Sequence, residues 1–346
     1  MTEGVATPGA GWRRADGGGA VRGPKRRRRS GRRAVGEAAM VDDAEFTSYY
    51  GRPIIKPPVW KTPDVPLYLF LGGAAGTSSV LGAMADLSGR PTLTRVARLV
   101  AGGGSIASVA FLVHDLGRPE RFLHMLRVFK PTSALSVGTY ILSPFSAAAG
   151  ATAAVELLGW FPRLKRFGGV VSALFGPPMT TYTAVLLANT AVPSWHAFRE
   201  KLPFVFAGSA MAAGGGICMV FTPVDEAGPA RKMAVTGAAI ELAMVHQVEN
   251  DESIVSEPYH LGRAGKLMQA AKTCTAAGAA LTVVAGRTRL GAVASGTLLA
   301  AGSLLTRFGV FDAGMASAKD PKYTVIPQRE RLAARQNDHA STISHT

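Results

Sequence analysis

Long apolar stretches alternate with short polar links along most of this chain. A helix of about 20 apolar residues is long enough to cross the hydrocarbon core of a bilayer. The pattern predicts eight such helices, at about residues 66–85, 96–113, 135–158, 168–191, 203–221, 231–248, 267–286 and 290–310. We therefore expect an all-α polytopic membrane protein.

Glycine and proline positions refine this pattern. The first helix carries a small-residue face for close packing at Gly72, Gly73, Gly76 and Gly82. Pro144 is expected to interrupt the third helix, and the Pro177-Pro178 pair is expected to break the fourth. The sixth helix is the weakest prediction because Glu241 lies within it.

The charges in the links bear on orientation. An even number of spans places both termini on one side of the membrane. The links on the opposite side are short and mostly basic, with Arg90, Arg95, Arg98, Arg163, Lys165, Arg166, Arg231, Lys232, Arg287 and Arg289 in or beside them. The positive-inside rule then predicts external termini. The basic residues 1–39 argue for the reverse, so this orientation depends on discounting them.

Much of the formal net charge of +15 sits in residues 1–39, where Lys25 to Arg29 and Arg32-Arg33 stand among glycines. Such a run is typical of a solvated, disordered tail, although a nucleic-acid-binding arm is an alternative. No apolar stretch of signal-peptide type follows it. Met40 resembles a natural start, so we interpret the preceding residues as a mis-assigned start or a dispensable tail.

The cysteine and histidine content argues against a metal centre in this chain. Its two cysteines, Cys218 and Cys274, cannot hold an iron–sulfur cluster, which needs about four thiolates. Haem between membrane helices usually requires paired histidines, but His114 and His246 lie near span ends. We expect no haem, no iron–sulfur cluster and no metal site here, so any such redox centre belongs to a partner.

The chemistry is expected where the second helix ends, at residues 114–123. Pro119 disfavours a helical Arg118 and suits the first position of a new, interfacial helix whose apolar face carries Phe122, Leu126 and Phe129. His114 and Asp115 then remain on the last turn of the membrane helix. They either exchange protons with a bound molecule or play a plainer part, with Asp115 capping or pairing with Arg118.

Four segments of this chain carry a family resemblance. They are Asp115-Leu116-Gly117-Arg118-Pro119, Tyr50-Gly51-Arg52-Pro53, Pro66-Leu67-Tyr68-Leu69-Phe70-Leu71-Gly72-Gly73 and Tyr182-Thr183-Ala184-Val185-Leu186-Leu187-Ala188. Together with eight predicted spans, they resemble the NrfD/PsrC family of membrane subunits in polysulfide-reductase-like complexes. The resemblance extends from about Tyr49 to the end of the eighth helix and is sharper in the first four.

The resemblance implies two four-helix bundles, with a quinone or quinol site in the first and menaquinone as the expected quinone. It implies a four-cluster ferredoxin-like iron–sulfur partner and, beyond it, a molybdopterin catalytic subunit. The expected divisions are a basic tail (1–48), a Pro-rich and aromatic interfacial segment (49–65), a first bundle (66–191), a second bundle (192–311) and a polar C-terminal tail (312–346).

The expected site lies on the side of the termini. The helix ends there carry Tyr68, His114, Asp115, Arg118, Tyr140, Asn189 and His196, and Tyr182 lies about two turns deeper. Quinone chemistry needs hydrogen-bond donors, a proton source and an apolar slot. Plainer alternatives are an interfacial anchor for Tyr68, helix packing for Tyr182, and ordinary loop-end positions for Asn189 and His196.

The second half offers fewer candidates. Glu241 lies mid-span, where a carboxylate suggests a proton relay that His246 and Arg307 could extend. Alternatively, Glu241 is structural, paired with Arg307 or hydrogen-bonded to serines and threonines.

The function expected is that of a cell-membrane subunit that exchanges electrons between the quinone pool and a docked iron–sulfur protein, and that is not catalytically complete alone. A transporter or proton channel is an alternative, motivated by Glu241 and the broken fourth helix. A purely structural anchor is another.

Overall fold

A computed structural model of the chain describes residues 53–118, 120–159 and 161–344, and these residues contain helices and no strands. Contacts separate residues 1–48 from residues 49–346, and only the second unit is treated below. The expected tail (1–48), the Met40 start, the Tyr50–Arg52 part of the motif and Pro119 lie outside the described residues.

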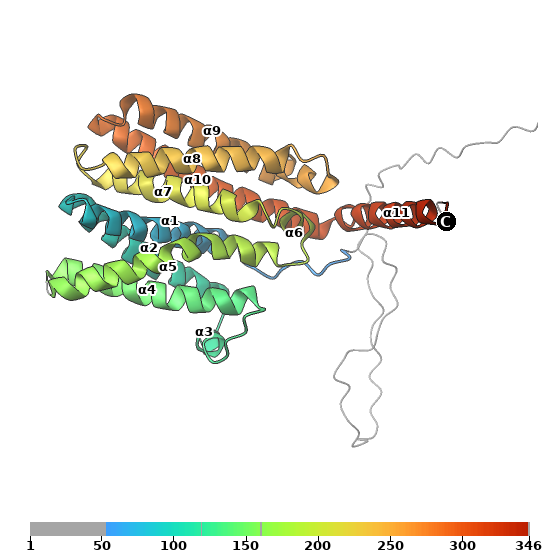
Figure 1. Cartoon of the computed structure of the whole chain (residues 1–346), viewed down its shortest axis with the longest axis horizontal. Coiled ribbons are helices and arrows are strands. Elements are labelled where there is room, and N and C mark those ends of the chain that lie inside the picture. The colour runs from blue at the N-terminus through green and yellow to red at the C-terminus, as the bar shows by residue number, and fades with distance from the viewer. Residues whose placement is uncertain (1–52, 119, 160, 345–346) are drawn as a thin grey trace, which may run out of the picture. The chain divides into compact units, whose positions relative to one another are not determined.

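Eight helices, which overlap the eight predicted spans, account for most of the described chain (Figure 1). They are α1 (Asp64–Leu87), α2 (Pro91–Asp115), α4 (Ala134–Leu158), α5 (Pro162–Ala188), α7 (Leu202–Phe221), α8 (Gly228–Glu249), α9 (Gly262–Ala285) and α10 (Arg289–Lys319). The other elements are α3 (Glu120–Met125), α6 (Pro193–Ala197), the 3-10 helix η1 (Ile254–Tyr259) and α11 (Lys322–Ser344).

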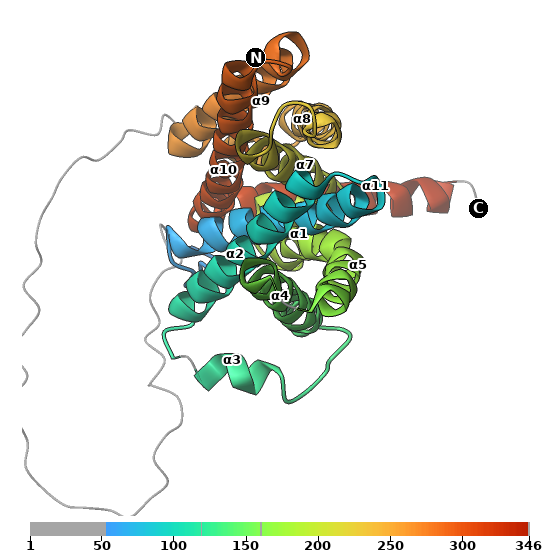
Figure 2. The same ribbon diagram turned by 90° about the vertical axis from the view of Figure 1, so that its left-hand side faces the viewer.

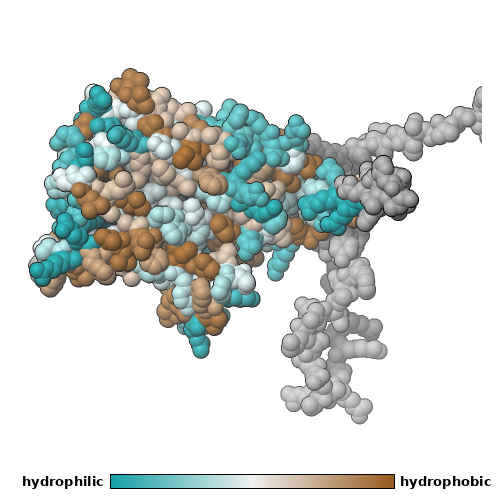
Figure 3. Space-filling model, viewed as in Figure 1, coloured by the Kyte–Doolittle hydropathy of each residue, from teal (hydrophilic) through white to brown (hydrophobic). Residues whose placement is uncertain are grey.

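Six of these helices, α1, α2, α4, α5, α7 and α10, are long and apolar enough to cross a membrane. The helices α8 and α9 have 22 and 24 residues, but they carry more polar residues, such as Glu241 and Lys272. On the face seen in Figure 3, hydrophobic residues gather mainly over the middle of the helices, and hydrophilic residues gather towards the two ends. The chain is thus a membrane protein with six candidate spans.

The long helices fall into two groups by their contacts (Figure 2). In the first helix group, α1 packs against α2 and α5, and α4 packs against α2 and α5. In the second helix group, α8 and α10 pack against α7, and α9 packs against α10. Contacts of α1 and α5 with α7 join the groups.

Glycines permit the closest helix approaches. A Cβ at Gly76 would lie 2.7 Å from the carbonyl oxygen of Gly176, and a Cβ at Gly216 would lie 2.8 Å from that of Gly296. These contacts join α1 to α5 and α7 to α10. The predicted small-residue face of the first membrane helix is confirmed at Gly76.

The prolines do not break the helices that contain them. Helix α4 continues through Pro144, and α5 continues through Pro177 and Pro178. The Thr180 hydroxyl donates to the Pro177 carbonyl at 2.7 Å, and neighbouring helices pack along α5. The expectation of an interrupted third helix and a broken fourth helix is wrong, because both helices continue through their prolines while packed against neighbouring helices.

The short links lie at the end of the helices away from His114, and here basic side chains cap carbonyl groups. Arg231 Nη1 donates to the Val224 carbonyl at 2.8 Å, and Arg289 Nη1 donates to the Thr222 carbonyl at 3.1 Å. Glu226, in the α7–α8 link, accepts the backbone N–H groups of Thr92 and Leu93 at 2.8 and 3.0 Å. It thereby caps the N-terminus of α2, which has no side-chain cap of its own.

The C-terminal part is more ordered than a polar tail. Helix α10 extends past the expected end near residue 310 to Lys319, with Ala313, Ser317 and Ala318 buried. The following residues form α11, which contacts α6 and η1.

Candidate functional site

The last turn of α2 meets the first turn of α1. His114 Nδ1 lies 2.7 Å from Asp64 Oδ2, and the Asp64 side chain is only 8% exposed whereas that of His114 is 73% exposed. The carboxylate therefore holds one ring nitrogen of a histidine that faces outward. Sequence reasoning missed Asp64, although a carboxylate heading the first apolar run and a histidine ending the second were detectable signals.

Asp115 joins the segment before α1 to α2. Its Oδ1 accepts the backbone N–H of Lys61 at 2.9 Å, and Lys61 Nζ donates to the His114 carbonyl at 3.3 Å. Asp115 therefore binds the Lys61 backbone and does not pair with Arg118. Arg118 is exposed, and its side chain has no partner within the described residues.

Two tyrosines lie behind Asp115. Tyr68 on α1 is 5% exposed, so it is not an interfacial anchor, and it lies near Tyr182 and Asp115. The Tyr182 ring on α5 lies against Gly138 of α4, where a Cβ would be 2.6 Å from the ring. In the part of the chain that the structure describes, neither phenol hydroxyl has a hydrogen-bond partner.

Apolar side chains surround these phenols. Tyr182 packs in one cluster with Leu142, Phe145 and Met179. Leu112 of α2 contacts both that cluster and the cluster that contains Tyr68. The first helix group thus brings Tyr68, Asp115 and Tyr182 together against an apolar wall. We call these three residues with His114 and Asp64 the candidate site.

Tyr140 is engaged in holding a loop. Its hydroxyl donates to the Leu126 carbonyl at 2.9 Å, and its ring meets Phe129 edge-on at 4.9 Å. Helix α3 ends at Met125, so Leu126 and Phe129 do not lie on the interfacial helix as expected. The reason is that these apolar residues are held by the start of α4, as Tyr140 shows.

Asn189 and His196 are not brought to the phenols by any described contact. Asn189 is exposed at the end of α5, and His196 Nδ1 lies 3.0 Å from the Ala188 carbonyl oxygen. His196 lines a separate hollow of about 850 Å³ with residues of α11 and the 253–255 segment. Their predicted role at the quinone site remains a prediction.

Glu241, in the second helix group, is 2% exposed. It accepts a hydrogen bond from Thr306 Oγ1 at 2.6 Å and a longer one from Thr275 Oγ1 at 3.4 Å. The sequence allows two structural roles for Glu241, an ion pair with Arg307 or hydrogen bonds to hydroxyl groups. The structure shows the hydrogen bonds, to two threonines, and no ion pair joins Glu241 to Arg307 among the described residues.

Arg307 is fully buried between the helix groups. Its Nη2 donates to the Phe206 carbonyl at 2.9 Å, and its guanidinium lies 3.8 Å from the centre of the Phe206 ring. His246 is exposed and bonded to Asn250, with no described contact to Glu241. Whether these groups form a relay remains a prediction.

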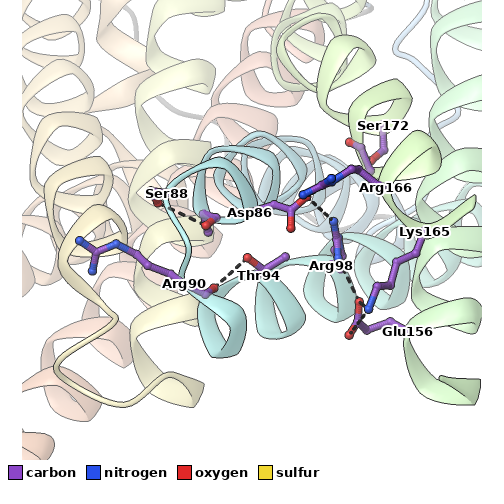
Figure 4. A network of polar contacts seen from close by, with 11 residues as sticks. Asp86, Ser88, Arg90, Thr94, Arg98, Glu156, Lys165, Arg166 and Ser172 are labelled. Carbon is purple, nitrogen blue, oxygen red and sulfur yellow. Dashed lines mark hydrogen bonds and ion pairs between the residues drawn. The ribbon is translucent and has the colours of Figure 1, made fainter. Parts of the chain in front are cut away.

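The opposite end of the first helix group holds a closed ionic network (Figure 4). Arg98, with a side chain only 7% exposed, bonds Asp86 and Glu156 at 3.2 Å each. Lys165 adds a contact to Glu156, and Arg166 adds one to Asp86, each at 3.3 Å. The sequence did not predict this network, because its members come from α1, α2, α4 and α5.

Comparison with known families now identifies the class of this protein. The family model described as polysulfide reductase, of NrfD type, matches residues 46–319. The chain therefore belongs to the NrfD family of membrane proteins. A search of curated proteins finds no match to the chain.

Proposed function

We propose that this chain exchanges electrons between the membrane quinone pool and a docked iron–sulfur protein. The observation that carries the proposal is the pair of unpartnered phenols, Tyr68 and Tyr182, beside Asp115 in an apolar surrounding within the described part of the chain. Neither hydroxyl oxygen is among the fully buried polar atoms of the described chain, so both are open to a bound molecule. A quinone offers two carbonyl oxygens to such donors and a flat ring to an apolar wall, so the residues present fit this substrate.

Proton exchange is assigned to His114 and Asp115. An ionised Asp64 can only accept hydrogen bonds, so His114 Nδ1 carries the hydrogen and Nε2 is the nitrogen free to exchange a proton. Reduction of a quinone takes up two electrons and two protons, and oxidation of a quinol releases them. The electrons are exchanged with the clusters of the partner subunit. The protons are exchanged through the exposed His114 side chain and Asp115.

The same proposal includes eight spans in two four-helix bundles. Helix α8 packs against α7 and α9 packs against α10, and the Lys272 side chain of α9 pairs with Glu249 of α8. Their charges are thus partly shielded from lipid. With the basic short links inside the cell, the positive-inside rule places the termini and the candidate site on the external side of the plasma membrane.

The proposed partners follow from the family. They are a four-cluster ferredoxin-like iron–sulfur subunit and a molybdopterin catalytic subunit, with menaquinone as the pool quinone. The α3 segment, which is exposed beside the candidate site, is the surface proposed to face the iron–sulfur subunit.

Glu241 is proposed as a proton-relay group, supported by its burial and by the two threonine hydroxyls that it accepts. Glu241→Gln should then lower proton release per electron in vesicles and leave quinone-linked electron transfer in detergent unchanged. An unaltered proton-to-electron ratio would leave Glu241 with a structural role.

The experiment that tests the main proposal uses the purified complex with Asp115→Asn or Tyr182→Phe. Both substitutions conserve shape, and in the first of them the side-chain amide oxygen can still accept the Lys61 N–H. Loss of a positioned donor or proton-transfer group costs about 10²-fold or more. Quinone-linked turnover should fall by that factor, while dye-linked activity of the catalytic subunit should be unchanged.

Tyr140→Phe is the matched control, because the Tyr140 hydroxyl is already bonded to the Leu126 carbonyl. It should retain most of the quinone-linked rate. Normal rates in both site variants would overturn the proposal. Absence of quinone binding by the intact complex would favour a structural anchor, and ion or solute transport without redox partners would favour a transporter.

A further inference from the structure

A groove of about 550 Å³ opens beside the C-terminal end of α1, where α1 faces α7 and the start of α8. Its apolar walls include Leu81, Met84, Met211 and Met233, and its basic members are Arg90 and Lys232. Met84 is 56% exposed, so the groove is open at its side. It lies at the end of the helices away from the candidate site and plays no part in the proposed redox chemistry.

The basic residues of the groove are free to meet an anion. Arg90 Nη1 donates to the carbonyl oxygens of Asp225 and Glu226 at 3.4 and 3.2 Å, while its Nη2 has no partner among the described residues. Figure 4 shows Arg90 pointing away from the Arg98 network. Lys232 is exposed and makes no side-chain contact within the described part of the chain.

The groove walls contain no carboxylate to neutralise these cations, as far as the described residues show. The nearest, Glu226, directs Oε2 to the N–H groups of Thr92 and Leu93 at the start of α2. By contrast, a second hollow at this end is lined by Asp86, and its Arg98 is already paired. Of these two hollows, the first therefore combines an unpaired cation, Lys232, with an apolar wall.

We infer that this groove binds one anionic phospholipid. The lipid phosphate would lie at Arg90 and Lys232, and one acyl chain would lie along Met84, Met211 and Met233. Methionine side chains are flexible and fit irregular apolar chains well. The apolar wall selects a lipid over a soluble phosphate, and basic pockets at helix ends on the cytoplasmic side are suited to anionic head groups.

The test is native mass spectrometry of the purified complex, delipidated and titrated with phosphatidylglycerol or phosphatidylcholine of the same chains. Phosphatidylglycerol should bind more tightly at one saturable site. Lys232→Ala should weaken that binding about fivefold, the effect of one basic residue at an anionic lipid surface. Met84→Trp, which fills the groove from its open side, should reduce the occupancy of the site.

Arg95→Ala is the matched control, since Arg95 is exposed at the same end of the molecule but does not line the groove. It should leave phosphatidylglycerol binding unchanged, and excess glycerol 3-phosphate should not displace the lipid. Equal binding of the two lipids, an equal loss in Arg95→Ala, or displacement by glycerol 3-phosphate would overturn the inference. Because quinone-linked turnover is measured separately, failure here leaves the proposed function standing.

Discussion

The two ends of the first helix group use charge in opposite ways. At the short-link end, Arg98, Asp86, Glu156, Lys165 and Arg166 pair in one ionic network, in which only the buried Nε of Arg98 lacks a described partner. At the candidate site, His114 reaches solvent from a single buried partner, Asp64, while the two phenol hydroxyls have no described partner. The same four helices thus hold one end with paired charges and leave donors available at the other.

This difference separates structural from chemical roles. A buried charge without its partner costs several kcal/mol, so a complete network is explained by folding alone. Polar groups that remain unpaired lower stability and are usually kept for a function. Variants at the network should therefore change stability first, and variants at the candidate site should change turnover first.

The largest effect is expected for Glu156→Leu. Arg98 would keep only Asp86, and a buried cation that loses a partner destabilises by about 3 kcal/mol, the lower end of the usual range because Asp86 remains. The melting temperature of the purified complex in detergent measures this. The double variant Arg98→Leu with Glu156→Leu should be more stable than the single one, and additive losses would contradict a coupled pair.

Next in size is Asp64→Asn at the candidate site. The neutral side chain keeps its shape but no longer stabilises a positive charge on His114, so quinone-linked turnover should fall about tenfold, or ~1.4 kcal/mol in activation free energy. Steady-state rates at saturating quinol measure the change. A normal rate, or a melting temperature lowered as much as in Glu156→Leu, would give Asp64 a structural role.

A smaller loss is expected for Glu226→Gln, about 1 kcal/mol, as for other helix-capping side chains. Desolvation opposes ionisation of Glu226, but the Leu93 and Thr92 hydrogen bonds and the Arg90 charge together lower its pKa below the usual 4.5. Because the pKa is lowered in the folded state, ionised Glu226 stabilises the folded protein at pH values above the unfolded-state pKa. This stabilisation is lost as the pH falls through the folded-state pKa. The difference in melting temperature between wild type and variant should therefore shrink below about pH 4.5; a constant difference would contradict this.

The smallest effect is expected for Arg118→Ala. An exposed side chain without partners in the described chain should change stability by less than about 0.5 kcal/mol. If Arg118 contacts the quinol, as predicted, KM should rise about threefold with kcat unchanged. An unchanged KM would remove Arg118 from the substrate site.

The sequence predicted the helices well because their signal is local. All eight expected ranges overlap a long helix, from residue 66 in α1 to residue 310 in α10. The sequence was less successful where contacts between distant segments determine whether a helix continues or ends. The prolines of α5 did not break the helix, and Leu126 and Phe129 did not join α3, because neighbouring helices hold both segments.

The candidate site shows the same limit. Its members Tyr68, His114, Asp115 and Tyr182 were predicted from residue type and position near helix ends. Asp64 was missed because its importance depends on the return of α2 to the start of α1, which brings His114 within 2.7 Å of it. Tyr140 was assigned to the substrate because its loop partner, the Leu126 carbonyl, was not visible in the sequence.

By itself, the sequence determined that this is a helical membrane protein of the NrfD type, because apolar run length and short motifs are properties of consecutive residues. Only the tertiary structure decided which polar groups are paired and which are free. It closed Arg98 into a network, gave Glu241 two threonine partners and left the phenols of Tyr68 and Tyr182 beside Asp115. The physical reason is that pairing depends on distance across helices, which hydrophobic patterning along one helix does not specify.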